Sequence, residues 1–277
     1  MTESWPADLS DITRARVGLG RVGVGLPTES LLQFRRDHAL ARDAVHETFD
    51  SAALAARLVD AGLDVVVVDT RAHVRGEFLR RPDLGRRLSE SASAELRALA
   101  KARAAEGRPG MDVVVAVSDG LSATGVDSHA VQLVTAIAAA LATRGITVGP
   151  VVVVPFGRVG VLNDIGDAVG ASSAAIVIGE RPGLSAPDSL SVYFEVAPRS
   201  GLDDSSRNCI SNIRPRGLPI EVAAVQVATL IAAGLQRGIS GTGLKLEYGE
   251  ATDALVAEEP AGLPDASPRL PIRGEDS

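Results

Sequence analysis

Short apolar runs rich in valine alternate with longer alanine-rich segments along most of this chain. Four such runs occupy residues 65–68, 113–117, 151–154 and 174–178, and each is bounded by polar, glycine or proline residues. Consecutive apolar β-branched side chains are typical of strands that are buried on both faces. Strands separated by helices are connected by crossovers and therefore pair in parallel. The pattern predicts an α/β protein with a mainly parallel sheet.

The balance between helix and strand changes near residue 106. Before this point the sequence favours three helical segments and a single strand run. After it, strand runs and amphipathic helices alternate as far as Gly238. We therefore expect a mainly helical N-terminal domain over residues 1–105, followed by a Rossmann-like, doubly wound domain over residues 106–243.

The formal net charge of −7 is concentrated at the C-terminal end. Between Glu247 and Ser277 stand eight acidic and two basic side chains, together with four prolines. A segment of this composition cannot bury enough apolar surface to fold, so residues 244–277 are predicted to be a disordered acidic tail. The rest of the chain is nearly neutral, and only 3% of all residues are aromatic. These two properties argue against nucleic acid as a partner.

Two further properties bear on the cellular location. No run of about 18 uncharged apolar residues is present, so no membrane span is expected. The single cysteine, Cys209, excludes an internal disulfide framework and suits a reducing cytoplasm.

Gly18, Gly20 and Gly23 match the G-x-G-x-x-G pattern of dinucleotide-binding folds. The pattern indicates an alternative function, that of a stand-alone Rossmann-type nicotinamide-binding oxidoreductase. The motif requires a strand directly before it, whereas the preceding segment is short and polar. We favour instead a glycine-rich segment, bearing Arg16 and Arg21, that lies across another surface.

Acidic side chains and a histidine between residues 112 and 129 could be imagined as a metal cluster. They lack the close ligand spacing of a metal site, and a near match to a cobalt-ligating D-x-H-x-x-G motif ends in glutamine instead of glycine. Asp119 is better explained as a solvated turn residue, and Asp127 as the N-cap of a helix. No G-x-S-x-G nucleophile motif occurs. The sequence therefore predicts neither a metal ligand nor a catalytic residue.

Polar loops follow three of the predicted strands. They cover residues 118–122, 156–159 and 179–184, and a fourth polar cluster covers residues 207–213. Because open α/β sheets bind ligands at the carboxyl ends of their strands, we expect these segments to form one rim. Arginines, a carboxylate, glycines and a thiol along that rim suit a large, amide-bearing ligand with little charge.

These segments, in this order, resemble the small (light) subunit of ethanolamine ammonia-lyase. The resemblance runs from about Asp11 to Gly238. The segments that carry it are TRARVGLGRVG, LLQFRRDHALARDAV, RPDLGRRL, VSDGLS, FGRVG, GERPGLS, and RNCISNI followed by a PIEVAA helix.

The resemblance implies the small subunit of an adenosylcobalamin-dependent lyase that converts ethanolamine to acetaldehyde and ammonia by radical chemistry. In that family a large barrel subunit holds the substrate, and the small subunit covers the lower, nucleotide-bearing side of the cofactor. Carried over by motif, Val159, Glu180 and Cys209 are expected to contact the cofactor, with Arg158 as a neighbour.

The resemblance also implies a partner and a location. The partner is the large subunit, in a hetero-oligomer, and Arg14, Arg16 and Arg21 of the N-terminal glycine-rich segment are expected to contact it. Some relatives carry a longer leader that directs them to a bacterial microcompartment. Because this chain begins only about ten residues before the matching region, we expect the free cytoplasm, with a microcompartment as the alternative location.

Overall fold

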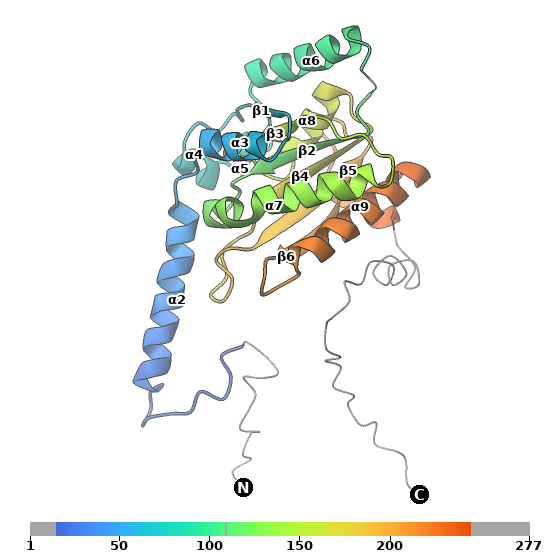
Figure 1. The fold of residues 1–277 in the computed structure, drawn as a ribbon. Coiled ribbons are helices and arrows are strands. Elements are labelled where there is room, and N and C mark those ends of the chain that lie inside the picture. Colours follow the sequence, from blue (N-terminus) through green and yellow to red (C-terminus); the bar gives the residue numbers. More distant parts are fainter. Residues whose placement is uncertain (1–14, 109, 245–277) are drawn as a thin grey trace, which may run out of the picture.

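The computed structural model describes residues 15–108 and 110–244 of the chain (Figure 1). The acidic tail expected over residues 244–277 lies outside the described residues, apart from Leu244. Within the described ranges, eight α-helices and one six-stranded sheet make up the fold. The predicted α/β class with a mainly parallel sheet is confirmed.

The strands lie in the order β1-β3-β2-β4-β5-β6 across the sheet. Strands β1 to β4 pair in parallel, whereas β5 runs antiparallel to both of its neighbours. The last three strands follow one another without an intervening α-helix, and antiparallel neighbours need no crossover helix between them. The bounds are β1 Val65–Val67, β2 Val113–Ser118, β3 Val151–Val153, β4 Ser173–Gly179, β5 Leu190–Val196 and β6 Asn208–Ile213.

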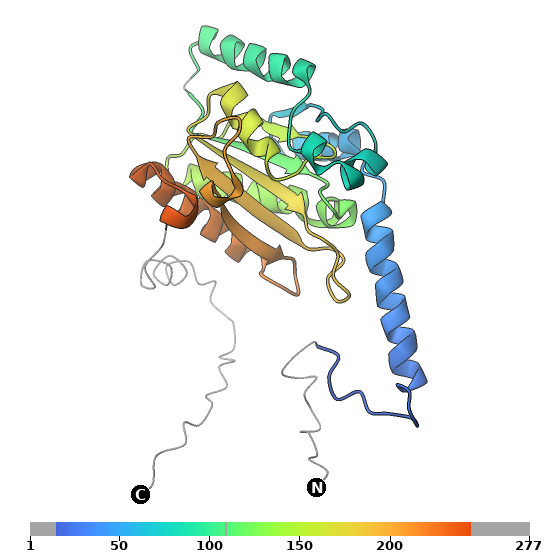
Figure 2. The same ribbon diagram turned by 180° about the vertical axis from the view of Figure 1, so that it is seen from behind.

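Helices cover both faces of the sheet (Figures 1 and 2). On one face lie α3 (Ser51–Asp60), α7 (Ala123–Ala142) and α9 (Ile220–Arg237), and on the other lie α6 (Glu90–Ala105) and α8 (Val161–Val169).

Alternate residues of β2 face the two helical layers. Val113 and Val115 belong to the core formed with α7 and α9, whereas Val114 and Ala116 belong to the core formed with α6 and α8. A strand that is covered on both sides has no solvent-facing position, since successive side chains point to opposite faces. This double burial explains why the valine run in β2 is uninterrupted.

Helices α7 and α9 are long and apolar enough to span a membrane by length and composition alone. In this fold they pack against each other and against the sheet, and Leu133, Ile137 and Ile231 are fully buried. Burial of each such side chain stabilises the fold by about 1.5–3 kcal/mol.

The start of α7 differs from the prediction. Ser122 caps the helix, because its hydroxyl accepts a hydrogen bond from the backbone N–H of Gly125 at 3.1 Å. Asp127, the expected cap, lies inside the helix and pairs with Arg57 at 2.7 Å. Its position one turn further along leaves no free backbone N–H for it to cap.

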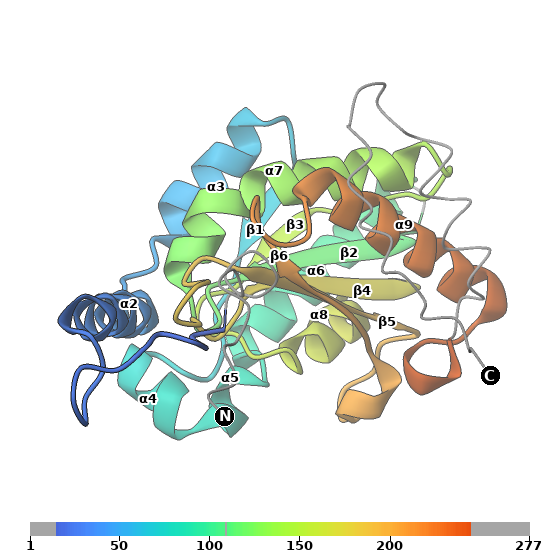
Figure 3. The same ribbon diagram turned by 90° about the horizontal axis from the view of Figure 1, so that it is seen from below.

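The N-terminal part contributes both to the sheet and to a projecting arm. Strand β1 is one of the two edge strands of the same sheet. The sheet therefore includes residues on both sides of the domain boundary expected between residues 105 and 106. Helix α2 (Thr28–His46) extends away from the body, and only Ala44 in it is buried (Figure 1). Two short helices, α4 (Arg75–Arg80) and α5 (Pro82–Gly85), lie beside the base of α2 (Figure 3).

Candidate functional site

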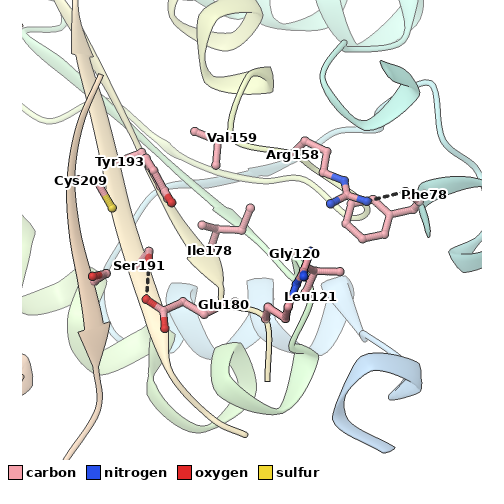
Figure 4. Close-up of a pocket in the computed structure, with 13 residues that line it drawn as sticks. Phe78, Gly120, Leu121, Arg158, Val159, Ile178, Glu180, Ser191, Tyr193 and Cys209 are labelled. Carbon is pink, nitrogen blue, oxygen red and sulfur yellow. Dashed lines mark hydrogen bonds between the residues drawn. The ribbon is translucent and has the colours of Figure 1, made fainter. Parts of the chain in front are cut away.

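A cavity of about 450 Å³ lies where the loops after β2, β3 and β4 meet the antiparallel strands β5 and β6 (Figure 4). This is the carboxyl end of the parallel strands, where open α/β sheets bind ligands. Its volume falls in the range of small-molecule sites. The lining residues are Phe78, Gly120, Leu121, Arg158, Val159, Ile178, Gly179, Glu180, Arg181, Ser191, Tyr193, Cys209 and Ser211.

The four site residues predicted from the sequence all line this cavity. Arg158 and Val159 come from the loop between β3 and α8, Glu180 follows β4, and Cys209 lies on β6. Their segments are distant in sequence, and the order of strands in the sheet brings them together. The polar rim expected at the strand ends is therefore present as one site.

Two glycines allow the loops after β2 and β4 to approach each other. Gly120 has a φ of +52°, and a Cβ added there would lie 2.4 Å from the carbonyl oxygen of Gly179. A Cβ on Gly179 would lie 2.2 Å from the carbonyl oxygen of Ser122. Neither position could hold a larger residue without moving a backbone segment. The close approach of the two loops therefore depends on glycine at both positions.

The carboxylate of Glu180 is fixed by three donors. The hydroxyls of Ser189 and Ser191 donate to it, and the backbone N–H of Asn212 donates to Oε1 at 2.8 Å. These bonds tie the end of β4 to β5 and β6. Two of them use Oε1 and one uses Oε2, so Oε2 keeps capacity to accept a further hydrogen bond. Glu180 is thus a preoriented acceptor at the cavity wall.

Tyr193 and Cys209 form the wall opposite the loops as a cross-strand pair of β5 and β6. Burial raises the pKa of the Tyr193 hydroxyl to about 12, and burial also raises the pKa of the Cys209 thiol. Both groups are therefore protonated near neutral pH, as a hydroxyl and a thiol. They can contact a neutral ligand, but neither is poised as a nucleophile or a base.

Arg158 lies at the other end of the cavity, stacked on an aromatic ring. Its Cζ is 3.9 Å from the ring centroid of Phe78, and its Nη2 donates to the carbonyl oxygen of Phe78 at 2.8 Å. Its backbone N–H donates to the carbonyl oxygen of Gly85 at 2.7 Å. Burial and the nearby positive charges of Arg75 and Arg181 lower the pKa of Arg158. These contacts hold the guanidinium in one place.

Asp119 corrects one sequence interpretation, because it is 1% exposed and is not a solvated turn residue. It pairs with Arg75 at 2.8 Å and accepts the backbone N–H of Phe156 at 2.7 Å. Burial raises the pKa of this carboxyl to about 6, although the charge of Arg75 opposes the shift. Arg75 also donates to the carbonyl oxygen of Gly120 at 2.7 Å. The pair braces the loop that lines the cavity.

Two other candidates lie outside the site. Arg207, expected on the rim, is buried and pairs with Glu195 at 3.1 Å, so it serves the packing beneath β5 and β6. His129 contacts Asp188 at 3.3 Å and does not line the cavity.

The glycine-rich motif over residues 18–23 lies in an exposed segment away from the carboxyl ends of the strands. The helix after it, α2, projects from the body instead of packing on the sheet, whereas a dinucleotide fingerprint needs a helix packed against its strand. The nicotinamide-binding alternative therefore has no support here.

Tyr193, Ser191, Phe78 and Arg75 belong to the site but were not predicted from the sequence. Tyr193 and Ser191 are two positions apart on β5, so alternation along an apolar strand at residues 190–196 could have placed them on one face. Nothing in the local sequence connects Phe78 or Arg75 to the strand ends, because both lie on the short helix α4.

The chain matches known proteins over most of its length. The family described as ethanolamine ammonia-lyase light chain matches residues 3–245. An ethanolamine ammonia-lyase small subunit of Pseudomonas syringae pv. tomato is 45% identical over 240 residues, covering 87% of this chain and 82% of that protein. The protein of the same name from Pseudomonas putida strain KT2440 is 46% identical, covering 86% of each chain. That from Azotobacter vinelandii is 45% identical, covering 89% of this chain and 90% of the relative.

Proposed function

The chain belongs to the ethanolamine ammonia-lyase light chain family, and on that premise we propose that it is the small subunit of an adenosylcobalamin-dependent ethanolamine ammonia-lyase. In this proposal a large subunit holds ethanolamine, which is converted to acetaldehyde and ammonia. The present chain binds one side of the cofactor in the cavity at the strand ends. It contributes binding and orientation and no catalytic group of its own.

One observation carries the proposal. Val159, Glu180 and Cys209 were assigned to the cofactor by their motifs and Arg158 as their neighbour, and all four line one cavity. If these motifs formed only local turns, their side chains would not need to line the same cavity.

The chemistry of the lining fits a corrinoid. Such a cofactor is a broad, flat ring whose edge carries many amide groups. Glu180 can accept a hydrogen bond from an amide N–H, and the hydroxyl of Ser211 can donate to an amide oxygen. Val159 and Ile178 offer apolar contact, and Gly120 and Gly179 beside Ile178 contribute backbone without side chains to the lining.

The size of the cavity supports a shared site. A space of about 450 Å³ holds a drug-sized molecule, whereas adenosylcobalamin is much larger. Only a portion of the cofactor would lie in this cavity, and a second chain would cover the rest. When bound, adenosylcobalamin supplies the radical chemistry of the reaction, and the residues of this chain keep one side of it oriented and shielded from water.

The projecting arm is the surface we assign to the large subunit. Arm residues Val22, Val24 and Leu32 are 69%, 104% and 57% exposed. Arg21 is exposed on the same arm, whereas Arg16 pairs with Asp37 and lies over the ring of Phe34. Arg14 lies outside the described residues. A helix with exposed apolar side chains gains stability by packing on another protein. We place the assembly in the cytoplasm.

The test is coexpression of this chain with a large subunit of the family. The proposal predicts copurification, saturable cobalamin binding by absorbance, and acetaldehyde release from ethanolamine when adenosylcobalamin is added. A well-folded complex that binds no cobalamin would overturn it. Saturable enhancement of NADH fluorescence by the chain alone would favour the nicotinamide-binding alternative instead.

A further inference from the structure

The cavity is electrostatically uneven from one end to the other. At one end, the carboxylate of Glu180 already accepts three hydrogen bonds from its own chain. At the other end lies Arg158 (Figure 4), and Glu180 is the one acidic side chain among the residues that line the cavity. The arginine end therefore carries positive charge that the cavity lining does not neutralise.

Arg158 has no carboxylate partner among the ion pairs of the described residues. Of its five N–H donors, the hydrogen bonds found in the described part of the chain use only one, from Nη2 to the carbonyl oxygen of Phe78. Its Nε is buried and makes no hydrogen bond there. A partly buried guanidinium with unused donors costs stability unless a bound group satisfies it.

The charges around Arg158 increase this cost. Arg75, Arg86 and Arg181 all lie near enough to oppose its charge. The one acidic group that favours the charged form is Asp119, and that carboxylate is already bonded to Arg75, Phe156 and Ser118. Arg75 and Arg86 have carboxylate partners of their own, Asp119 and Asp204. An incoming anion would therefore meet Arg158 and Arg181, for which the described residues supply no ion pair.

The position of Arg158 is also fixed before any ligand arrives. Stacking on Phe78 and the backbone bond to Gly85 restrict the side chain and its loop. A Cβ added to Gly85 would lie 2.6 Å from the carbonyl oxygen of Phe156 and 3.0 Å from Cγ of Arg158, so the loop and α5 are in close contact. A preoriented guanidinium suits the oxygens of a phosphate group, because little entropy is lost on binding.

We propose that the arginine end of the cavity, centred on Arg158, is a subsite for a phosphate-type anion carried by the ligand. This inference rests on the proposed function: in adenosylcobalamin the group of that chemistry is the phosphodiester of the nucleotide loop. Binding would pair the guanidinium with the phosphodiester oxygens and relieve the repulsion among the neighbouring arginines. The subsite would also fix which edge of the cofactor faces Phe78.

The experiment compares two corrinoids on the complex with the large subunit. Cobalamin has the phosphodiester, and cobinamide has the same corrin ring but lacks the phosphate, ribose and benzimidazole of the nucleotide loop. Each is titrated by absorbance with wild type, Arg158→Met, Arg158→Lys and the control Arg81→Met. Arg81 is an exposed arginine at the end of α4 that pairs with Asp83, so its loss removes a charge nearby without touching the cavity.

Arg158→Met should weaken cobalamin binding about 10- to 100-fold, which is the range for the loss of one charge-assisted contact. The same variant should leave cobinamide binding within about twofold of wild type. Arg158→Lys should recover part of the loss, and Arg81→Met should change neither affinity. The ratio of the two affinities within one variant does not depend on the fraction folded. An equal effect on both corrinoids, or none on either, would overturn the subsite.

Competition with inorganic phosphate tests whether the anion at Arg158 is the phosphodiester of the cofactor or a free phosphate ion. If the subsite binds the phosphodiester, millimolar phosphate should compete with cobalamin for the wild-type complex. The competition should be absent in the Arg158→Met complex. Phosphate binding that depends on Arg158 but leaves cobalamin affinity unchanged would overturn the assignment to the cofactor. Failure of both corrinoids to bind the wild-type complex would instead count against the proposed function itself.

Discussion

Nη1 of Arg75 lies 2.8 Å from Oδ2 of Asp119, and this ion pair of a partly buried guanidinium with a buried carboxylate joins three parts of the molecule. The same arginine donates to the carbonyl oxygens of Val45, at the end of α2, and of Gly120, in the cavity loop. The base of the projecting arm is thus bonded through one side chain to the loop that lines the site.

Replacing Arg75 should destabilise the fold more than an average substitution. Arg75→Met leaves the Asp119 carboxylate buried without its cation, and breaking a buried pair in this way costs about 3–5 kcal/mol. The measurement is the free energy of unfolding by urea titration at pH 7.5. The double variant Arg75→Met, Asp119→Asn should recover much of the loss, because no buried charge then remains. A loss below about 1 kcal/mol in the single variant would show that the pair contributes little.

The raised pKa of Asp119 predicts a pH dependence with a definite sign. The folded pKa is about 6 and the unfolded value is about 3.8, so between these values the folded state binds more protons than the unfolded state. The contribution of Asp119 is therefore most favourable at low pH and decreases by up to ~3 kcal/mol as pH rises from about 4 to 6.

Asp119→Asn isolates this contribution from those of other carboxyls. The difference in unfolding free energy between wild type and Asp119→Asn should fall as pH rises through this window and level off above it. The check is a series of urea titrations from pH 4 to 7.5. A difference that is constant or grows with pH would mean that the folded pKa of Asp119 is not raised.

Glu180→Gln tests whether the carboxylate binds the cofactor. The amide keeps the size of the side chain and one acceptor oxygen, so the bonds from Ser191 and Asn212 can persist. The expected result is at least tenfold weaker cobalamin binding with little change in stability, because a charged acceptor for amide N–H groups is lost. Glu221→Gln, on the exposed side of α9, is the matched control. Unchanged affinity would favour a scaffold role in which the small subunit only assembles the large one.

Gly120→Ala tests the close approach of the two loops. The new Cβ would lie 2.4 Å from the carbonyl oxygen of Gly179 in addition to the strain of a φ of +52°. Gly107→Ala is a matched control, because Gly107 has a φ of +69° and nothing within 4 Å of the added atom. The control should lose about 1–2 kcal/mol of stability, and Gly120→Ala clearly more, together with cobalamin affinity. Equal losses in the two variants would mean that the loops separate without cost.

Much of the fold could be predicted because a strand that is buried on both faces has an uninterrupted run of apolar residues. The runs at residues 113–117 and 174–178 are valine-rich or isoleucine-rich since both faces of β2 and β4 are covered. The direction of β5 could not be predicted the same way, because an apolar strand has the same composition in either orientation. The absence of a helical segment between β4 and β5 was the available signal.

The candidate site was predictable where it depends on the ends of strands. Glycines and polar residues after an apolar run mark such ends, and this placed Arg158 and Glu180 on one rim. Asp119 stands in the same kind of loop, yet it is buried because Arg75 reaches it from a helix more than forty positions earlier. An ion pair between residues that are distant in the sequence produces no periodic pattern from which it could be predicted.

The position of the cofactor can be tested through the only cysteine of the chain. Cys209 lines the cavity, and its residue is exposed in the structure of this chain alone. Maleimide modification of Cys209 in the complex with the large subunit, followed by mass analysis of its peptide, measures access to the site. If the cofactor occupies the cavity, saturating cobalamin should slow this modification at least tenfold. An unchanged rate with cobalamin bound would show that the cofactor does not occupy this cavity.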